Sequence, residues 1–185
     1  MIELKDIFAE GKAYEQQVFD LYEEAFPEVE KKPQQMLRKL VRTGFMEILA
    51  VTENEEFIGL AMNLMYQKWA LLDYFAITPS KRGGGYGGQA IGKLLEKFKD
   101  KKYIFEIEMQ DPAAENAGDR RRRKQFYLRN GLHETGVFAN VYDTDFELLT
   151  PDGELTYGEY VDVLHHMLGE EVLKHINPRE ICTQR

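Results

Sequence analysis

The sequence predicts an α/β fold in which helices cover a central mixed sheet. Three observations lead to this prediction. Apolar residues recur at helical spacing near the N-terminus, the spacing changes to alternation after Gly44, and strands then take turns with helices as far as Leu149. With 185 residues, of which 43% are apolar, the chain suits one soluble domain whose core needs no disulfide or metal.

Each expected element follows from its local pattern. Alternation at 2–5 predicts a short strand, helical spacing at 14–26 predicts a helix that ends at Pro27, and a second helix is expected between Pro33 and Gly44. The remaining elements are strands at 45–52 and 57–66 around a turn at 53–56, a strand at 69–77, a helix after the glycines that follow it, a strand at 103–110, a helix ending at Gly131, and strands near 132–142 and 146–149.

The C-terminal part of the chain predicts one more helix. Thr156 and Glu159 form a capping box, and Gly169 is a natural stop. The apolar stripe expected to be buried consists of Tyr157, Val161, Leu164 and Leu168. We expect a main domain at 1–150 and a helical extension at 151–185 that packs on it, with a homodimer contact as the alternative, and no regular structure beyond Pro178.

Composition narrows the classes of function. The net charge of −8 and the pI near 5.1 argue against nucleic-acid binding and anionic membranes, and they mildly favour a cationic substrate. The single cysteine, Cys182, allows neither an internal disulfide nor a cysteine-based zinc site. No leader and no apolar run long enough for a membrane helix is expected, so we predict a cytoplasmic protein.

The strongest local signal is the segment 77–88. An apolar strand leads into five glycines within 83–88, and a helix begins at once. Glycine lets a ligand approach the backbone, and a helix N-terminus offers free N–H groups to an anion. Gln89 and Ala90 exclude a P-loop, whereas a dinucleotide-type Gly-x-Gly-x-x-Gly match is weak here because no acidic residue ends a strand about twenty residues later. The alternative is a merely flexible turn.

These residues resemble the GNAT superfamily of N-acetyltransferases. The family signature Arg/Gln-x-x-Gly-x-Gly/Ala matches residues 82–87. Residues 75–79 (Phe-Ala-Ile-Thr-Pro) resemble the end of the strand that precedes this signature in the family. Residues 125–132 resemble the family's later Phe-Tyr-x-x-x-Gly-Phe segment, with Leu132 in place of its last Phe. The resemblance covers about 2–149. It implies the GNAT fold, a central and mostly antiparallel sheet flanked by helices, with 1–150 as the N-acetyltransferase domain.

The resemblance also implies acetyl-CoA as the co-substrate. Pantetheine would pair with the backbone of β-strand residues Phe75 and Ile77, and the backbone N–H nearest Ala76 would face the thioester oxygen. The residues implied to bind acetyl-CoA are Phe75, Ala76, Ile77, Arg82, Gly83, Gly84, Gly85, Tyr86, Gly87, Gly88, Asn116 and Tyr127. Asn116 could instead be an ordinary helical residue if a helix starts at 111–112.

Acetyl transfer to an amine requires a base for the amine and a proton donor for the leaving thiolate. The resemblance makes Tyr127 the candidate acid, with a core aromatic as the alternative. Alternation places Glu106 and Glu108 on one strand face, and Asp73 shares a face with Phe75. We rank Glu108 and Glu106 ahead of Asp73 as the base, although ordinary ion pairs would explain all three carboxylates.

Two other features are interpreted as structural. The basic run 120–124 is expected to be a solvated helix face, with one member available to the 3′-phosphate of CoA. His165 and His166 cannot both face one metal from a helix, so no metal is predicted.

The leading hypothesis is an N-acetyltransferase that moves the acetyl group of acetyl-CoA to a primary amine by direct attack in a ternary complex. The alternatives are a non-catalytic acyl-CoA sensor of the same fold and a nucleotide-binding regulatory domain. The acceptor, a small molecule or a peptide, would meet residues 26–30 and 137–142, where Glu28 and Glu30 suit a cation.

Overall fold

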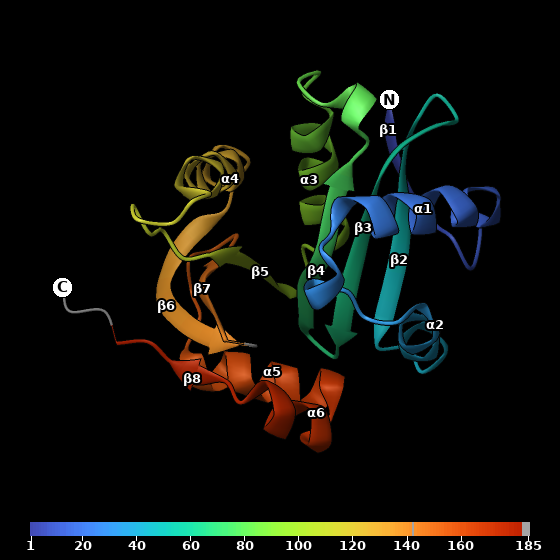
Figure 1. Ribbon diagram of the computed structural model, residues 1–185. Helices are drawn as coiled ribbons and strands as arrows, with labels where there is room; N and C mark the ends of the chain where they lie inside the picture. The colour runs from blue at the N-terminus through green and yellow to red at the C-terminus, as the bar shows by residue number, and fades with distance from the viewer. Residues whose placement is uncertain (142, 183–185) are drawn as a thin grey trace. The chain divides into compact units, whose positions relative to one another are not determined.

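The computed structural model describes residues 1–141 and 143–182, and it shows an α/β protein with two compact units (Figure 1). The first unit comprises Met1–Met65 and Leu72–Lys99, and the second comprises Tyr66–Leu71 and Asp100–Arg185. The strand Trp69–Ile77 (β4) therefore begins in the second unit and ends in the first. The domain division at 150 stays a prediction.

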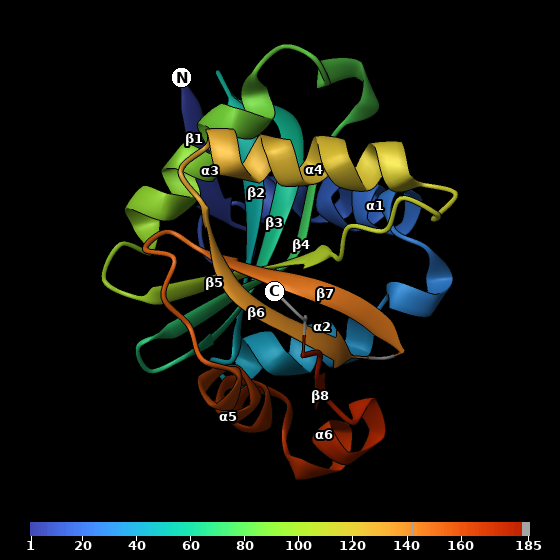
Figure 2. The same cartoon turned by 90° about the vertical axis from the view of Figure 1, so that its left-hand side faces the viewer.

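The first unit is a run of strands with helices on both faces. In chain order its elements are β1 (Ile2–Asp6), α1 (Glu15–Ala25), α2 (Gln34–Arg42), β2 (Met46–Glu53), β3 (Glu56–Tyr66), the end of β4 and α3 (Tyr86–Lys97). The strands lie in the order β1-β2-β3-β4, with β1–β2 and β2–β3 antiparallel. Figures 1 and 2 show α1 on one side of these strands and α3 on the other.

Apolar side chains on both faces explain why two layers of helix form. Under α3, a buried cluster contains Ile2, Val51, Ile58 and Ala90, and Phe75 packs against it. On the other face α1 buries Val18, Phe19, Leu21 and Tyr22. Almost every residue of β2 is buried, as expected for a strand that is covered on both sides.

The second unit has its own antiparallel strands and helices. Its elements are β5 (Lys102–Glu108), α4 (Ala117–Arg129), β6 (His133–Val141), β7 (Thr144–Thr150), α5 (Tyr157–Leu168), α6 (Glu170–Ile176) and β8 (Arg179–Glu180). The strand order is β5-β7-β6-β8, and all three pairs are antiparallel. Figure 2 shows α4 above these strands and α5 below them.

The predicted elements are confirmed, with two corrections near the C-terminus. The expectation of no regular structure beyond Pro178 is wrong for 179–180, which form β8, and α6 was not foreseen. The capping box of Thr156 with Glu159 is present, and Gly169 ends α5. Residue 142, in the expected strand 132–142, lies outside the described residues.

The buried stripe of α5 differs from the expected one. The structure buries Tyr160, Val163, Leu164 and Met167, so only Leu164 was foreseen. The helix carries apolar residues around most of its circumference, and spacing alone cannot choose between two adjoining stripes. The buried stripe is covered within the single chain.

Candidate active site

The glycine turn after β4 has the conformation that its composition predicts. Gly83 and Gly85 have φ values of +82° and +78°, in the left-handed region, and Gly85 is the N-cap of α3. A Cβ built on either residue would meet nothing within 4 Å. Glycine is therefore required at both positions by backbone angle rather than by lack of space, and the turn is open to a ligand.

The N-terminus of α3 follows directly. Gln89 N–H donates to the carbonyl of Gly85 at 3.2 Å, so the helical ladder begins at Gln89. The N–H groups of Tyr86, Gly87 and Gly88 precede that ladder and lie at the positive end of a twelve-residue helix. This donor set fits a pyrophosphate or another oxyanion.

Arg82 connects this turn to the preceding strand. Its Nε donates to the carbonyl of Ile77 at 3.1 Å, while the residue as a whole is exposed. The guanidinium therefore fixes the path of the turn and still brings positive charge to its rim. Gly84 is packed more closely, because a Cβ there would lie 2.9 Å from the ring of Tyr86.

The end of β4 is shaped by a glycine that the sequence analysis missed. A Cβ on Gly59 of β3 would lie 2.4 Å from the carbonyl oxygen of Ala76 and 2.9 Å from the side chain of Ile77. Only glycine lets β3 approach β4 so closely at the place where acetyl-CoA binding is predicted. The available signal was a glycine in the interior of a predicted strand, which often marks a close backbone approach.

Asp73, a candidate base, is held by a lysine from the loop between α1 and α2. Lys32 Nζ lies 2.8 and 2.9 Å from the two carboxylate oxygens of Asp73. The Asp73 side chain is only 10% exposed. Both carboxylate oxygens are engaged by this one ammonium, so the ordinary ion-pair interpretation suits Asp73 better than catalysis.

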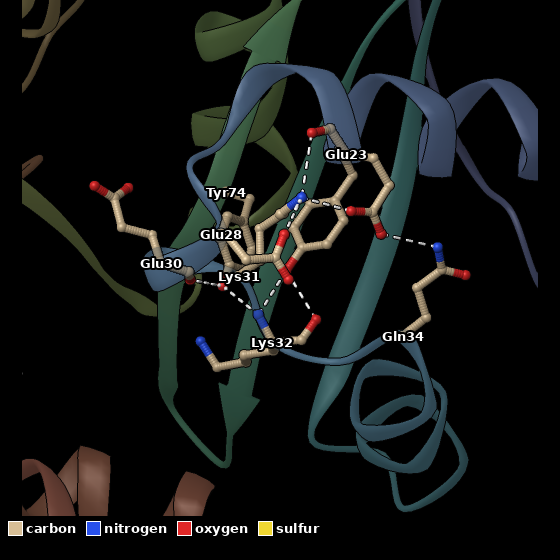
Figure 3. A network of polar contacts seen from close by, with 8 residues as sticks. Glu23, Glu28, Glu30, Lys31, Lys32, Gln34 and Tyr74 are labelled. Carbon is tan, nitrogen blue, oxygen red and sulfur yellow. Dashed lines mark hydrogen bonds and ion pairs between the residues drawn. The ribbon is translucent and has the colours of Figure 1, made fainter.

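That loop is itself fastened by buried tyrosines (Figure 3). Tyr74 donates to the carbonyl of Glu30 at 2.6 Å, and Lys32 N–H donates to the hydroxyl of Tyr22 at 2.7 Å. The Glu28 carboxylate lies 3.0 Å from Lys31 Nζ, which also binds Glu23. The loop proposed to meet an acceptor thus has a fixed backbone.

In the second unit, Tyr127 is a buried residue of α4. It is 8% exposed and packs edge-on against Phe105 of β5, with ring centroids 5.4 Å apart. Burial raises the pKa of Tyr127 to about 12, so the phenol keeps its proton at neutral pH. Tyr127 can therefore act as a donor while it also packs in the core.

Glu108 lies in a cluster with cationic groups of α4. Its carboxylate oxygens lie 3.1 Å from Arg120 and 2.7 Å from Arg123, and Asn116 Nδ2 donates to it at 3.2 Å. Asn116 is the N-cap of α4, so the alternative of a helix starting at 111–112 is wrong. These partners make Glu108 a weaker candidate for a base than the sequence indicated.

Glu106 has a different environment. Its Oε1 accepts a hydrogen bond of 2.5 Å from the hydroxyl of Tyr160 on α5. The adjacent Phe105 packs on Tyr127 of α4, so β5 presents Glu106 and Phe105 to opposite faces. Glu106 and Glu108, expected on one face, have partners on different helices because Glu108 is the last residue of β5 and its side chain reaches back to α4.

The basic run on α4 is only partly a solvated face. Arg120 and Arg123 bind Glu108, and Lys124 Nζ lies 2.8 Å from buried Glu147 on β7. Arg121, Arg122 and Arg123 are exposed. The expectation of a solvated face is therefore wrong only for Arg120 and Lys124, whose side chains are 21% and 19% exposed.

Two further properties concern metals and membranes. Across the described residues, no group of three histidine, cysteine, aspartate or glutamate side chains is arranged to hold a metal ion. None of the helices within 1–141 and 143–182 is long and apolar enough to cross a membrane.

Comparisons with known proteins agree with the fold. A GNAT-family protein from Bacteroides thetaiotaomicron has a similar structure, with a TM-score of 0.71 and 22% sequence identity. The alignment covers 90% of this chain and 95% of that protein. The ribosomal-protein-S18-alanine N-acetyltransferase of Escherichia coli aligns over 84% of this chain and 96% of its own, with a TM-score of 0.59 and 15% identity. A GNAT acetyltransferase from Elizabethkingia anophelis, with acetyl-CoA bound, aligns over 64% and 82%, with a TM-score of 0.50 and 16% identity. Comparison with curated proteins gives no match.

The sequence itself carries the family assignment. A profile of the Acetyltransferase (GNAT) family matches residues 15–127, which is more than half of the chain. The resemblance deduced from the glycine turn and its flanking segments is thereby confirmed. The chain belongs to the GNAT family of acetyltransferases and is an enzyme of the acyltransferase class.

Proposed function

We propose that this enzyme transfers the acetyl group of acetyl-CoA to a primary amine by direct attack of the amine on the thioester in a ternary complex. The observation that carries the proposal is the open glycine turn, where Gly83 and Gly85 adopt left-handed angles beside the free N–H groups of α3. This arrangement suits the pyrophosphate of CoA. Acetyl-CoA is bound by the Elizabethkingia anophelis relative.

The backbone at Ala76 is proposed to polarise the thioester carbonyl. A backbone N–H there would donate to the oxygen as the carbonyl carbon becomes tetrahedral. Gly59 supports this role because its lack of a Cβ sets the spacing between β3 and the Ala76 carbonyl. The proposal therefore assigns β4 both the pairing with pantetheine, through Phe75 and Ile77, and the stabilisation of the oxyanion.

Tyr127 is proposed to donate a hydrogen bond to the departing thiolate. Its pKa of about 12 exceeds the ordinary thiol value of about 8.5, so complete proton transfer would be uphill by about 5 kcal/mol. Donation of a hydrogen bond carries no such penalty and still stabilises the developing negative charge on sulfur. We therefore assign Tyr127 the role of hydrogen-bond donor rather than that of a full proton donor.

Glu106 is proposed as the base. The C–N bond forms as the amine attacks, the C–S bond breaks, and the amine proton passes to the Glu106 carboxylate. Asp73 and Glu108 are less suitable because each is held by the cationic group of a lysine or arginine. The Tyr160 hydroxyl donates a hydrogen bond to Glu106 Oε1, and such a bond supports the charged form of a carboxylate.

The acceptor is proposed to be an amine on a small molecule or a peptide, in the cytoplasm. The net charge of −8 favours a cation over a nucleic acid. The Escherichia coli relative is named for acetylating an alanine of a protein. This supports amine chemistry in the same fold.

Binding of CoA measured by calorimetry tests the cofactor site. Replacing Gly85 with Val forces a β-branched residue into a left-handed angle and should abolish binding. Gly92→Ala is the matched control on the same helix, because a Cβ there meets nothing within 4 Å, and it should bind normally.

Thiol release from acetyl-CoA with a panel of amines then tests the reaction. Acetyl transfer to at least one amine is the expected result. A protein that binds CoA but transfers acetyl to no acceptor would instead be an acyl-CoA sensor of the same fold. Failure of the unmodified protein to bind CoA would remove the proposal altogether.

A further inference from the structure

One hydrogen bond links the C-terminal extension to the proposed base. Tyr160 on α5 is fully buried, with 0% exposure, and its hydroxyl donates to Glu106 Oε1 at 2.5 Å. Tyr160 lies beyond residue 127, where the family match ends, so nothing in that match assigns it a role. A buried tyrosine hydroxyl usually has a hydrogen-bond partner, and here that partner is a half-buried carboxylate of β5.

The helix that carries Tyr160 is fixed by further contacts within the second unit. The Glu159 carboxylate closes the capping box with Thr156 and lies 3.7 Å from Lys102 Nζ on β5. Near the other end of α5, the His166 ring stacks on Tyr66 with centroids 4.5 Å apart and planes 18° apart. Contacts at both ends of the helix determine where the Tyr160 hydroxyl lies relative to β5.

We propose that Tyr160 is a positioning residue: its hydroxyl holds the carboxylate of Glu106 in the orientation that accepts the proton from the attacking amine. The inference rests on the proposed function. It assigns the C-terminal extension a part in catalysis that the first 150 residues do not supply.

The chemical character of the partner supports this role. A glutamate side chain has three rotatable bonds, and fixing them costs on the order of 1–2 kcal/mol of conformational entropy. The hydrogen bond from Tyr160 offsets this entropy when the protein folds, before the substrate binds. A lysine or arginine would also fix a carboxylate, but its charge would oppose proton uptake. A tyrosine fixes the carboxylate and contributes no charge.

The test compares Tyr160→Phe with the unmodified full-length enzyme. The substitution removes only the hydroxyl and keeps the buried ring. Loss of a hydrogen bond to a charged group should lower kcat by about 10- to 100-fold. The KM for acetyl-CoA should stay within twofold, because Tyr160 is not assigned to the cofactor site. Tyr157→Phe, which removes a hydroxyl from the same helix, is the matched control and should keep normal turnover.

A double-mutant cycle with Glu106→Gln separates positioning from packing. If Tyr160 acts through Glu106, adding Tyr160→Phe to Glu106→Gln should change kcat by less than twofold. Glu106→Asp, which keeps the charge but shortens the side chain, provides a second background with the same expectation. Thiol release is measured with the best amine and also with water as acceptor, so the cycle does not depend on the natural acceptor.

The outcomes separate this inference from the proposed function. A normal kcat in Tyr160→Phe overturns the positioning role, and so does a loss of kcat from Tyr160→Phe that is equally large in the Glu106→Gln background. Neither result contradicts acetyl transfer itself. A rise in KM for acetyl-CoA at constant kcat also overturns it, because the residue would then serve binding. If the unmodified enzyme binds CoA and releases no thiol with any acceptor, the proposed reaction fails and the inference fails with it.

Discussion

At the scale of single residues, the spacing between β3 and the end of β4 depends on the missing Cβ of Gly59. A Cβ on Gly59 would lie 2.4 Å from the carbonyl oxygen of Ala76, which is too close for a Cβ and a non-bonded oxygen. The obstacle is backbone rather than the end of a flexible side chain. The end of β4 would therefore have to move to accommodate even alanine.

We expect Gly59→Ala to lower kcat/KM for acetyl-CoA by about 10- to 100-fold, because a displacement near 1 Å of a catalytic group has an effect of this size. Stability should fall as well, by about 1–3 kcal/mol, as in other overpacked sites. Steady-state kinetics and urea unfolding measure the two effects. Gly92→Ala, on an open helix surface, should change neither by much. Normal kinetics in Gly59→Ala would contradict the proposed role of the Ala76 backbone in polarising the thioester carbonyl.

Tyr127→Phe should reduce kcat by about 100-fold and leave the affinity for acetyl-CoA nearly unchanged, because its hydroxyl acts on charge that develops during the reaction. The ring remains packed against Phe105, so the fold should be retained. With a pKa of about 12, the phenol stays protonated below about pH 10. The rate profile of the unmodified enzyme should consequently show no decline from Tyr127 ionisation below that pH. Unchanged turnover in Tyr127→Phe would return the residue to a packing role.

At the scale of elements, α4 is joined to the strands of the second unit through a buried ion pair. Glu147 on β7 is 2% exposed, and both its oxygens lie within 2.9 Å of Lys124 Nζ. Burial raises the pKa of Glu147 even though Lys124 favours its charged form. Lys124 also contacts Glu134 on β6, so a single ammonium connects the helix to two strands.

Lys124→Met should destabilise the protein by about 3–5 kcal/mol at pH 7, because it leaves a charged carboxylate buried without its partner. The deficit should narrow as the pH falls toward the ordinary carboxyl pKa of 4.5, where Glu147 takes up a proton and the unpaired charge disappears. The double variant Lys124→Met with Glu147→Leu should recover most of the loss, since an apolar pair of similar volume can replace a buried ion pair. Urea unfolding at several pH values measures the loss of stability in Lys124→Met, its dependence on pH and the recovery in the double variant. A double variant that is no more stable than Lys124→Met would contradict the stabilising role given to the ion pair.

The sequence predicted the elements well because most of them depend on local patterns. β4 has the predicted bounds, and the capping box marked the start of α5. The buried face of α5 could not be predicted in the same way, because two adjoining stripes are apolar and only the partner decides between them. Tyr160 was missed for this reason, since its partner Glu106 is 54 residues away in the chain.

The same distinction applies to the candidate site. The glycine turn is a local signal, and its predicted angles and free N–H groups are present. The partners of Asp73 and Glu108 are Lys32, Arg120 and Arg123, which come from separate elements. Alternation along a strand indicates which face a carboxylate occupies, but it does not indicate which cation will reach it.

At the scale of the whole molecule, binding of acetyl-CoA should stabilise the fold by linkage. At a concentration 100-fold above the dissociation constant, the gain is about 2.7 kcal/mol. For a chain of 185 residues this corresponds to an increase in Tm of about 5–10 °C. Differential scanning calorimetry over a series of CoA concentrations should show Tm rising with the logarithm of concentration. ATP and NAD at the same concentrations should have little effect, and an equal response to either would favour a nucleotide-binding regulatory domain.

The short strand β8 has a consequence for self-association of the protein. Arg179 and Glu180 pair with Asn140 and Ala139 of β6, and Ile181 N–H donates to the Phe138 carbonyl at 3.0 Å. Uncovered strand edges are templates on which other chains can pair and aggregate, and natural proteins protect them with short, charged strands. β8 has both properties. We therefore expect that disturbing residues 179–181, for example with a C-terminal fusion placed close to them, would lower solubility before it lowered activity.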